Sequence, residues 1–235
     1  QRKRFITADG SLGYMIFFEN LEAATAAAQE VLITDQLDTN LQWSTLSLGT
    51  MQIGEKTITV PEGSQSFSHM VDLRPAVDAL AEVECSYDPD TGVAEWIFRG
   101  RDPSTGELAD LLPPNTQEVA PLGQGWVSYT IAQEPGLTTG TAITNMATID
   151  FEIDIFPPPI ETPEFVNTID SGAPTSQVKP LPTAVTTTFT VEWEGADDEN
   201  GSGIMDYTIY VSEDGNVYTK WLEYTTQTWA EFTGE

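Results

Sequence analysis

The sequence predicts an all-β protein made of two antiparallel β-sandwich domains. Several segments alternate apolar and polar residues with a period of two, which is the pattern of half-buried strands in antiparallel sheets. Strand-forming Thr, Val, Ile, Tyr and Trp are frequent, and 18 glycines and 15 prolines supply turns. No apolar run approaches the ~18 residues that a membrane-spanning helix needs, so we expect no membrane insertion.

In residues 1–170 the alternation recurs at short intervals, beginning at Tyr14 to Phe18. Further strands are expected at 31–34, 57–60, 66–73, 80–87, 94–98, 127–131, 142–155 and 160–168. The turns 88–92 and 102–106 each contain Pro and then Gly, as bulged hairpins require. The Ala-rich stretch 21–28 is long enough for two helical turns, although a helix this short is marginal in isolation.

A domain boundary is expected at 169–174, where Gly, Pro and small residues interrupt the strand pattern. This gives a large domain over 1–170 and a small one over 171–235. The small domain has room for about five strands, whereas an immunoglobulin or fibronectin-like sandwich has about seven in ~100 residues. We therefore expect it to lack its last strands and to leave the strand at 205–211 with a bare edge. Either the missing strands follow Glu235, or a neighbouring chain supplies a strand.

The charge is strongly negative: 37 acidic residues stand against nine basic ones, for a formal net charge of -28. Arg2, Lys3 and Arg4 supply three of the nine, and past Arg101 only Lys179 and Lys220 remain. A folded domain this acidic repels itself unless cations screen or bridge its carboxylates. The charge argues against nucleic acid or an anionic membrane as a partner. It favours an extracellular protein that binds divalent cations.

The strongest cation candidate is an acidic loop in the small domain. It comprises Asp197, Asp198, Glu199 and Asn200, with Asp206 following and Asp170 at the domain boundary. Ca²⁺ takes six to eight oxygen ligands from carboxylates, amides and carbonyls, so this loop suits it. The spacing does not match an EF-hand, and a solvated acidic turn is the alternative. A second candidate is Asp150, Glu152 and Asp154, which alternation places on one strand face that could equally be solvent-exposed.

The sequence offers no catalytic constellation, and we expect a protein that is not an enzyme. His69 is the only histidine, and its alternation with Phe67 and Val71 places it on a sheet face. Cys85, the only cysteine, is expected to be a buried inert thiol. Neither a phosphate-binding glycine loop nor a Gly-x-Ser-x-Gly elbow occurs. Three aromatic residues in the small domain could instead stack on a sugar or fill the core: Trp221, Tyr224 and Trp229.

Four segments of the first domain resemble a β-rich domain of uncharacterised function that recurs in very large secreted and surface proteins of bacteria: 5–20, 31–38, 125–131 and 165–170. In the second domain, 193–198, 201–204 and 207–212 are similar to immunoglobulin or fibronectin type III modules, which often follow that domain.

The resemblance implies a stalk, adhesin or matrix protein of the cell envelope and supplies no catalytic residue. We expect an extracellular bacterial structural or assembly module, stabilised by Ca²⁺, whose partners are other modules of the same long chain or a second chain joined by strand pairing. The alternative is an adhesive or carbohydrate-binding accessory module of a secreted protein, with a glycan as its partner.

Overall fold

A computed structural model describes residues 3–153, 158–183 and 187–234 of the chain. None of these residues lies in a helix, and the paired strands run antiparallel. The prediction of an antiparallel all-β fold is therefore confirmed. Among the described residues no helix is long and apolar enough to cross a membrane.

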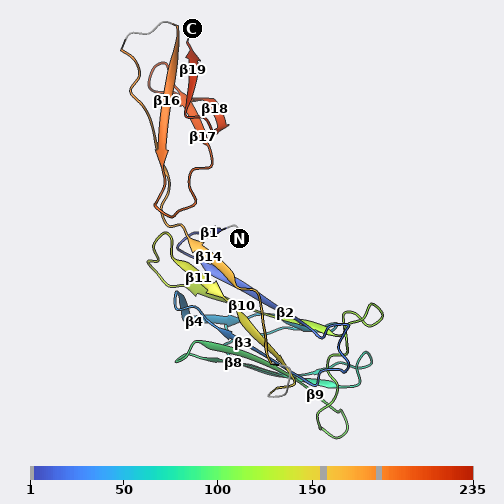
Figure 1. The fold of residues 1–235 in the computed structure, drawn as a ribbon. Coiled ribbons are helices and arrows are strands. Elements are labelled where there is room, and N and C mark those ends of the chain that lie inside the picture. The colour runs from blue at the N-terminus through green and yellow to red at the C-terminus, as the bar shows by residue number, and fades with distance from the viewer. Residues whose placement is uncertain (1–2, 154–157, 184–186, 235) are drawn as a thin grey trace. The chain divides into compact units, whose positions relative to one another are not determined.

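The chain divides into two compact units (Figure 1). The large unit comprises Asp9–Leu137 and Ala142–Asn167, and the small unit comprises Gln1–Ala8, Thr138–Thr141 and Thr168–Glu235. The last passage between them, at 167/168, lies three residues before the expected boundary at 170/171. The assignment of 1–170 and 171–235 as domains stays a prediction.

The large unit contains a six-stranded sheet of order β13-β12-β3-β9-β8-β7. Its strands, in chain order, are β3 (Glu30–Gln36), β7 (Phe67–Asp72), β8 (Leu80–Asp88), β9 (Val93–Arg101), β12 (Ala147–Phe151) and β13 (Ile160–Glu161). The second sheet has the order β2-β10-β5-β6, and β4 also pairs with β10. Its strands are β2 (Ser11–Glu19), β4 (Leu41–Leu48), β5 (Met51–Ile53), β6 (Lys56–Ile58) and β10 (Gln124–Gln133). A short sheet has the order β1-β14-β11, with β1 (Arg4–Ile6), β11 (Ala142–Asn145) and β14 (Phe165–Ile169).

The core of the large unit lies between its two main sheets, where the inward residues of each alternating strand meet. Trp96 and Phe98 of β9 are fully buried, as is Tyr129 of β10 at 1% exposure. Rings from opposite sheets contact one another: Trp96 stacks on Tyr129 at a centroid separation of 5.7 Å, and Phe18 packs at a tilt against Phe98 at 5.4 Å. Aromatic pairs at this spacing stabilise a core beyond the area that they bury.

The Ala-rich stretch 21–28 forms turns, so the expectation of helical turns is wrong. The Asn20 side-chain amide donates to the carbonyl of Ala26 at 3.0 Å and to that of Leu112 at 2.8 Å. Ala28 also forms a β-bridge with Leu112. These long-range hydrogen bonds outweigh the weak helix propensity of so short a segment.

A buried polar network crosses the core of the large unit. The Asp35 carboxylate is 0% exposed and accepts hydrogen bonds from the Tyr129 hydroxyl (2.7 Å) and the Asn145 amide (3.0 Å). The same amide donates to the Tyr129 oxygen at 2.9 Å. Burial raises the pKa of Asp35, because a low-dielectric interior disfavours the charged carboxylate.

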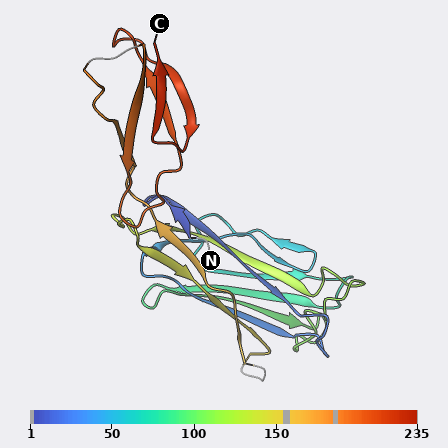
Figure 2. The same cartoon turned by 45° about the horizontal axis from the view of Figure 1, so that its top comes forward.

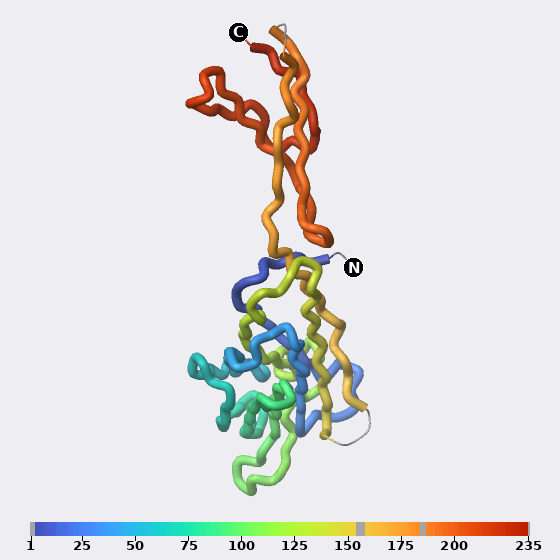
Figure 3. The backbone as a smooth tube through the Cα atoms, turned by 90° about the vertical axis from the view of Figure 1, so that its left-hand side faces the viewer, coloured from blue at the N-terminus to red at the C-terminus, as the bar shows by residue number. Residues whose placement is uncertain are grey.

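From Thr175 onward, the described residues of the small unit form five strands in two sheets. One has the order β15-β16-β19, from Thr175–Val178, Thr188–Ala196 and Trp229–Thr233; the other pairs β17 (Tyr207–Val211) with β18 (Thr219–Thr225). Val191, Trp193 and Ile209 are its buried core, with Phe189, Tyr207, Trp221, Leu222, Ala230 and Phe232 packed around them. Figure 3 shows this unit as the orange-to-red part of the trace. The five strands match the number counted in the sequence.

The Asp35 network makes a prediction for stability. We expect Asp35→Ala to lower the free energy of unfolding of the large unit by about 2 kcal/mol, because the Asn145 amide and the Tyr129 hydroxyl lose a buried acceptor. Asp35→Asn retains an acceptor oxygen and serves as the matched control with a smaller loss. Urea denaturation at pH 7 measures both, and an unchanged midpoint for Asp35→Ala contradicts the assignment.

The same residue predicts a pH dependence. The raised pKa means that folded Asp35 keeps its proton at a pH where the unfolded chain, with an ordinary Asp pKa of ~3.9, has lost it. The contribution of Asp35 to stability is therefore largest below about pH 4 and declines as the pH rises to the folded pKa. The stability of the wild type relative to Asp35→Asn should fall over that range. A difference that rises with pH would show that the ionised form is the favoured one.

Candidate functional site

The acidic residues of the small unit come together around Gly201. Asp170 follows β14, while Asp197 and Asp198 follow β16. A Cβ atom added at Gly201 lies 3.0 Å from Asp197 Oδ2, 3.1 Å from Asp170 Oδ1 and 3.2 Å from the Asp198 carbonyl oxygen. Oxygens from two separate loops thus surround the space left by the missing side chain. We call Asp170, Asp197, Asp198 and Gly201 the acidic loop cluster.

Hydrogen bonds from the backbone hold the carboxylates of this cluster in place. The Ser202 N–H donates to Asp170 Oδ2 at 3.0 Å, and the Gly203 N–H donates to Asp197 Oδ2 at 2.6 Å. The pKa of Asp170 is lowered by its hydrogen bonds with the Ser202 side chain and backbone, which favours its charged form. The second oxygens, Asp170 Oδ1 and Asp197 Oδ1, are shielded from solvent and have no protein partner.

Asp198 has a different set of partners within the same unit. Its Oδ2 accepts a hydrogen bond of 2.6 Å from the Thr139 hydroxyl. The Thr139 oxygen in turn accepts one of 2.9 Å from the Ser171 N–H. These bonds tie the loop 197–203 to the segments around 139 and 171. The Asp198 carbonyl accepts a hydrogen bond of 3.0 Å from the Gly201 N–H, which directs it toward that glycine.

The other predicted ligands lie elsewhere in the small unit. Asn200 has a φ of 69° and packs its Cβ beside Gly140, whereas Glu199 is exposed. Asp206 lines a groove between β15 and β17. Across the described ranges, no three His, Cys, Asp or Glu side chains form a group arranged to hold a metal ion. Of the predicted set, the structure brings together only Asp170, Asp197 and Asp198.

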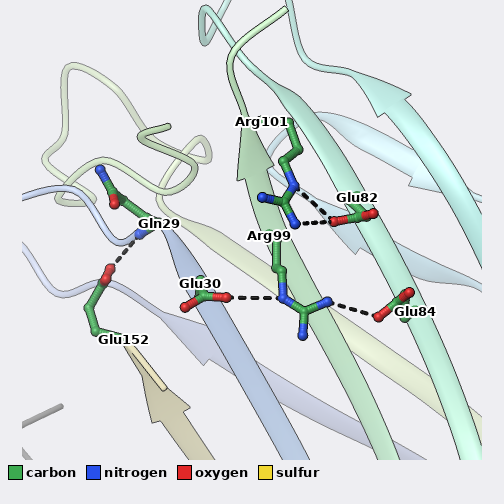
Figure 4. A network of polar contacts seen from close by, with 7 residues as sticks. All are labelled: Gln29, Glu30, Glu82, Glu84, Arg99, Arg101 and Glu152. Carbon is green, nitrogen blue, oxygen red and sulfur yellow. Dashed lines mark hydrogen bonds and ion pairs between the residues drawn. The ribbon is translucent and has the colours of Figure 1, made fainter. Parts of the chain in front are cut away.

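The second carboxylate candidate does not form a shared face. β12 ends at Phe151, and Glu152 turns away with a φ of 65° to accept a hydrogen bond from the Gln29 backbone N–H (Figure 4). Asp150 remains in the strand with one oxygen buried and without a protein partner. Asp154 lies outside the described residues. The expectation that alternation aligns these side chains is wrong for Glu152, because β12 ends at Phe151.

The outer face of the six-stranded sheet carries an ion-pair row that sequence reasoning missed (Figure 4). Arg99 on β9 lies between Glu30 at 3.0 Å and Glu84 at 2.8 Å, and Arg101 pairs with Glu82 at 2.7 Å. The sequence signal was the period-two spacing of Arg99 and Arg101, which places both on one strand face. The pairing of β9 with β3 and β8, which brings the glutamates beside them, is given by the structure. The row offsets part of the excess negative charge and offers no reactive group.

A groove of about 270 Å³ runs between β15 and β17 in the small unit. Thr175 to Val178 form one wall, Ile204 and Asp206 to Tyr210 form the other, and Trp193 also lines it. Among the described strands, β15 pairs only with β16 and β17 only with β18, so both walls are sheet edges. The Trp193 indole N–H is buried without a protein partner.

The three aromatic candidates do not form one platform. The Trp221 ring packs edge-on against Trp193 at 6.3 Å and Phe232 at 5.2 Å, so it belongs to the core. Tyr224 and Trp229 are 76% and 54% exposed. In the described part of the chain, the ring contacts of Trp221 do not include either of them.

The single cysteine and the single histidine have ordinary environments. Cys85 is buried with its Sγ 3.6 Å from Met51 Sδ, and burial raises the pKa of the thiol to about 12, as expected of an inert thiol. His69 lies on the edge strand β7 with its ring 5.8 Å from that of Phe67, and its side chain is exposed. It is thus a sheet-face residue rather than a core one.

Comparisons with known proteins place the chain in no family. No protein-family model matches the sequence, and no curated protein matches it. Among solved structures, the chain is similar to the collagen-binding domain of a Staphylococcus aureus adhesin, with 10% identity and a TM-score of 0.34 over 68% of this chain and 87% of that one. It is also similar to AvmM, which catalyses macrocyclization in alchivemycin A biosynthesis, with 9% identity and a TM-score of 0.31 over 74% and 87%. Likenesses at this level identify neither a family nor a function.

The aromatic geometry predicts which tryptophan supports the fold. We expect Trp221→Ala to lower the free energy of unfolding of the small unit by about 2 kcal/mol, because it removes a half-buried ring from the core. Trp229→Ala, the matched control on the exposed face, should change it by less than about 0.5 kcal/mol. Urea denaturation followed by far-UV circular dichroism measures both. Equal losses would show that the two rings are packed alike.

Proposed function

We propose that this chain is a non-catalytic structural and assembly module of an extracellular bacterial surface or matrix protein, and that Ca²⁺ stabilises its small unit. The observation that carries the proposal is the acidic loop cluster, where two carboxylate oxygens are shielded from water without any protein partner. An ionised carboxylate in that situation is costly unless a cation completes its environment. The sequence resemblance to modules of large bacterial surface proteins supports the extracellular location.

The residues present fit a calcium ion better than other divalent metals. The available donors are all oxygens: Asp170 Oδ1, the Asp197 carboxylate and the Asp198 carbonyl, which lie within 3.2 Å of one point beside Gly201. Ca²⁺ accepts such mixed carboxylate and carbonyl sets and completes its shell with water. Zn²⁺ prefers His and Cys ligands, which this loop lacks. The ion would hold the loop 197–203 against Asp170 and reduce the repulsion among the aspartates.

Calcium stabilisation predicts a ligand-dependent melting temperature. A ligand that binds only the folded state stabilises it by about 2.7 kcal/mol at a hundredfold excess over its dissociation constant. We expect the transition of the small unit, followed by calorimetry, to rise in millimolar CaCl₂ and to fall when EDTA is added.

Matched variants locate the effect. Asp170→Asn and Asp197→Asn should each abolish most of the calcium-dependent shift. Asp214→Asn should retain it, because Asp214 lies in a separate turn where the Asn216 and Val217 N–H groups lower its pKa to about 2. If wild type shows no shift at millimolar Ca²⁺, the ion has no part in the function. A shift that survives both loop variants would place it at another site.

Assembly by strand addition is the second candidate, and the groove between β15 and β17 favours it. Two sheet edges border this groove, and its apolar lining includes Val178, Trp193 and Ile209. An extended segment of a neighbouring chain, placed there, would pair with β17 and cover Trp193. An adhesive, glycan-binding role receives less support, because Trp221 is part of the core rather than of an exposed platform.

Strand addition predicts self-association that depends on concentration. We expect light scattering in 0.5 M NaCl, which screens the repulsion between acidic chains, to show oligomers as the protein concentration increases. Thr208→Lys places a charge on the β17 edge and should suppress them, because a lysine on an edge strand opposes pairing. A monomer at every concentration contradicts this candidate.

A further inference from the structure

Among the described strands of the large unit, β2 is a long edge strand without the usual protection. β2 is nine residues long and lies at the end of its sheet, where β10 is its partner among the described strands (Figure 2). From Ser11 to Phe18 it contains no charged residue and no proline, the devices that normally keep an edge strand from pairing. By contrast, the edge strand β13 has only two residues, and β6 has three and begins with Lys56.

The hydrogen bonds of β10 show which of its residues face β2. The Gly49 N–H donates to the Ser128 carbonyl and the Gly54 N–H to the Gln124 carbonyl, both at 2.8 Å, so these residues of β10 face β4 and β5. Successive residues of a strand direct their backbone groups to opposite sides. Val127 and Tyr129 therefore bond to β2, opposite Ile16 and Tyr14.

The remaining residues of β2 direct their backbone groups away from β10. These are Gly13, Met15 and Phe17, which alternate with Tyr14 and Ile16. Their N–H and C=O groups form a row along the outer edge with the spacing that an added strand requires. A Cβ atom added at Gly13 meets nothing within 4 Å, so the sheet face beside the edge is open at this position.

An apolar groove of about 330 Å³ lies along this edge. One wall is Gly13 to Phe17, and the other includes Thr162, Pro163 and Phe165, with Asn145 also in the lining. Met15 is 49% exposed and Phe17 65% exposed. The groove is lined by consecutive residues of β2, whose side chains point alternately to the two faces of the sheet. A strand added along this edge would therefore place its own alternate side chains against each face.

The rim of the groove is acidic and therefore favours a positively charged ligand. Glu161 and Glu164 flank the wall at Thr162 and Pro163 with exposed side chains, and Glu19 ends β2. The residues that line the groove include no lysine or arginine. The net charge of -28 makes a second copy of this chain an unfavourable occupant, since the two copies repel each other. A positively charged segment is attracted instead.

We propose that the free edge of β2 and its groove bind an extended peptide segment of another protein by strand addition, and that this segment alternates apolar side chains between lysine or arginine residues. Backbone hydrogen bonds to Gly13, Met15 and Phe17 supply register, alternate apolar side chains fill the groove, and basic flanks pair with Glu161 and Glu164. This site lies in the large unit, so it is independent of the calcium cluster and of the groove in the small unit.

The test uses the full chain and a blocked peptide of sequence Lys-Lys-Val-Thr-Val-Thr-Val-Lys-Lys. We expect isothermal titration calorimetry at low salt to show binding that weakens as NaCl is added, because exposed charges are screened. Amide hydrogen exchange should become slower at Met15 and Phe17. A peptide in which glutamate replaces the lysines should bind at least tenfold more weakly.

A proline variant distinguishes backbone pairing at the β2 edge from nonspecific peptide binding. Met15→Pro removes an N–H at the free edge of β2, and we expect at least tenfold weaker binding. Met70→Pro is the matched control: it makes the same change on the edge strand β7, where Met70 is 46% exposed, and it should leave binding unchanged. Circular dichroism confirms that both variants fold, and Glu161→Gln with Glu164→Gln offers a charge-only variant that should weaken binding without a proline.

Three results would overturn the proposal. One is no binding at millimolar peptide. Another is equal affinity for the Met15→Pro and Met70→Pro variants, or for the acidic and basic peptides. The third is light scattering that shows the chain itself associating through an edge that Met15→Pro disrupts, because a second copy would then be the occupant.

Discussion

The structure of the large unit depends on aromatic packing between two facing sheets. Trp96 and Phe98 from one sheet contact Tyr129 and Phe18 from the other, and Tyr14 stacks on Tyr129 at 5.1 Å. With a single cysteine, the chain has no intrachain disulfide to supplement this contact. The apolar interior must therefore outweigh both chain entropy and the repulsion of an acidic surface. The ion-pair row and the free edge of β2 lie on strands that this core holds in register.

The acidic side chains have different kinds of partner in different parts of the molecule. On the outer face of the six-stranded sheet, Arg99 and Arg101 neutralise glutamates across neighbouring strands. Inside the core, Asp35 is satisfied by hydrogen bonds from Tyr129 and Asn145 rather than by a counter-charge. In the acidic loop cluster, backbone N–H groups bind one oxygen of each of two aspartates and leave the other without a partner. The calcium ion proposed above would give these two oxygens a partner.

Each of the two units has exposed sheet edges. β2 in the large unit borders an apolar groove, and the β15 and β17 edges in the small unit border a groove of mixed polar and apolar lining. The grooves differ in their surroundings: the one beside β2 has an acidic rim and a glycine with open space, whereas the other gives access to a core tryptophan.

The sequence by itself determined the all-β class, the strand positions with strict alternation and the burial of Cys85, because a period of two is a local property that burial of one face imposes. It also pointed to Asp170, Asp197 and Asp198 through their local density. The tertiary structure alone decided that Asp206 lines a groove between β15 and β17, that Trp221 faces the core and that Glu152 leaves its strand. It also revealed the Asp35 network and the open edge of β2. Those features depend on which strands become neighbours, and strand order is fixed by long-range packing that no short segment encodes.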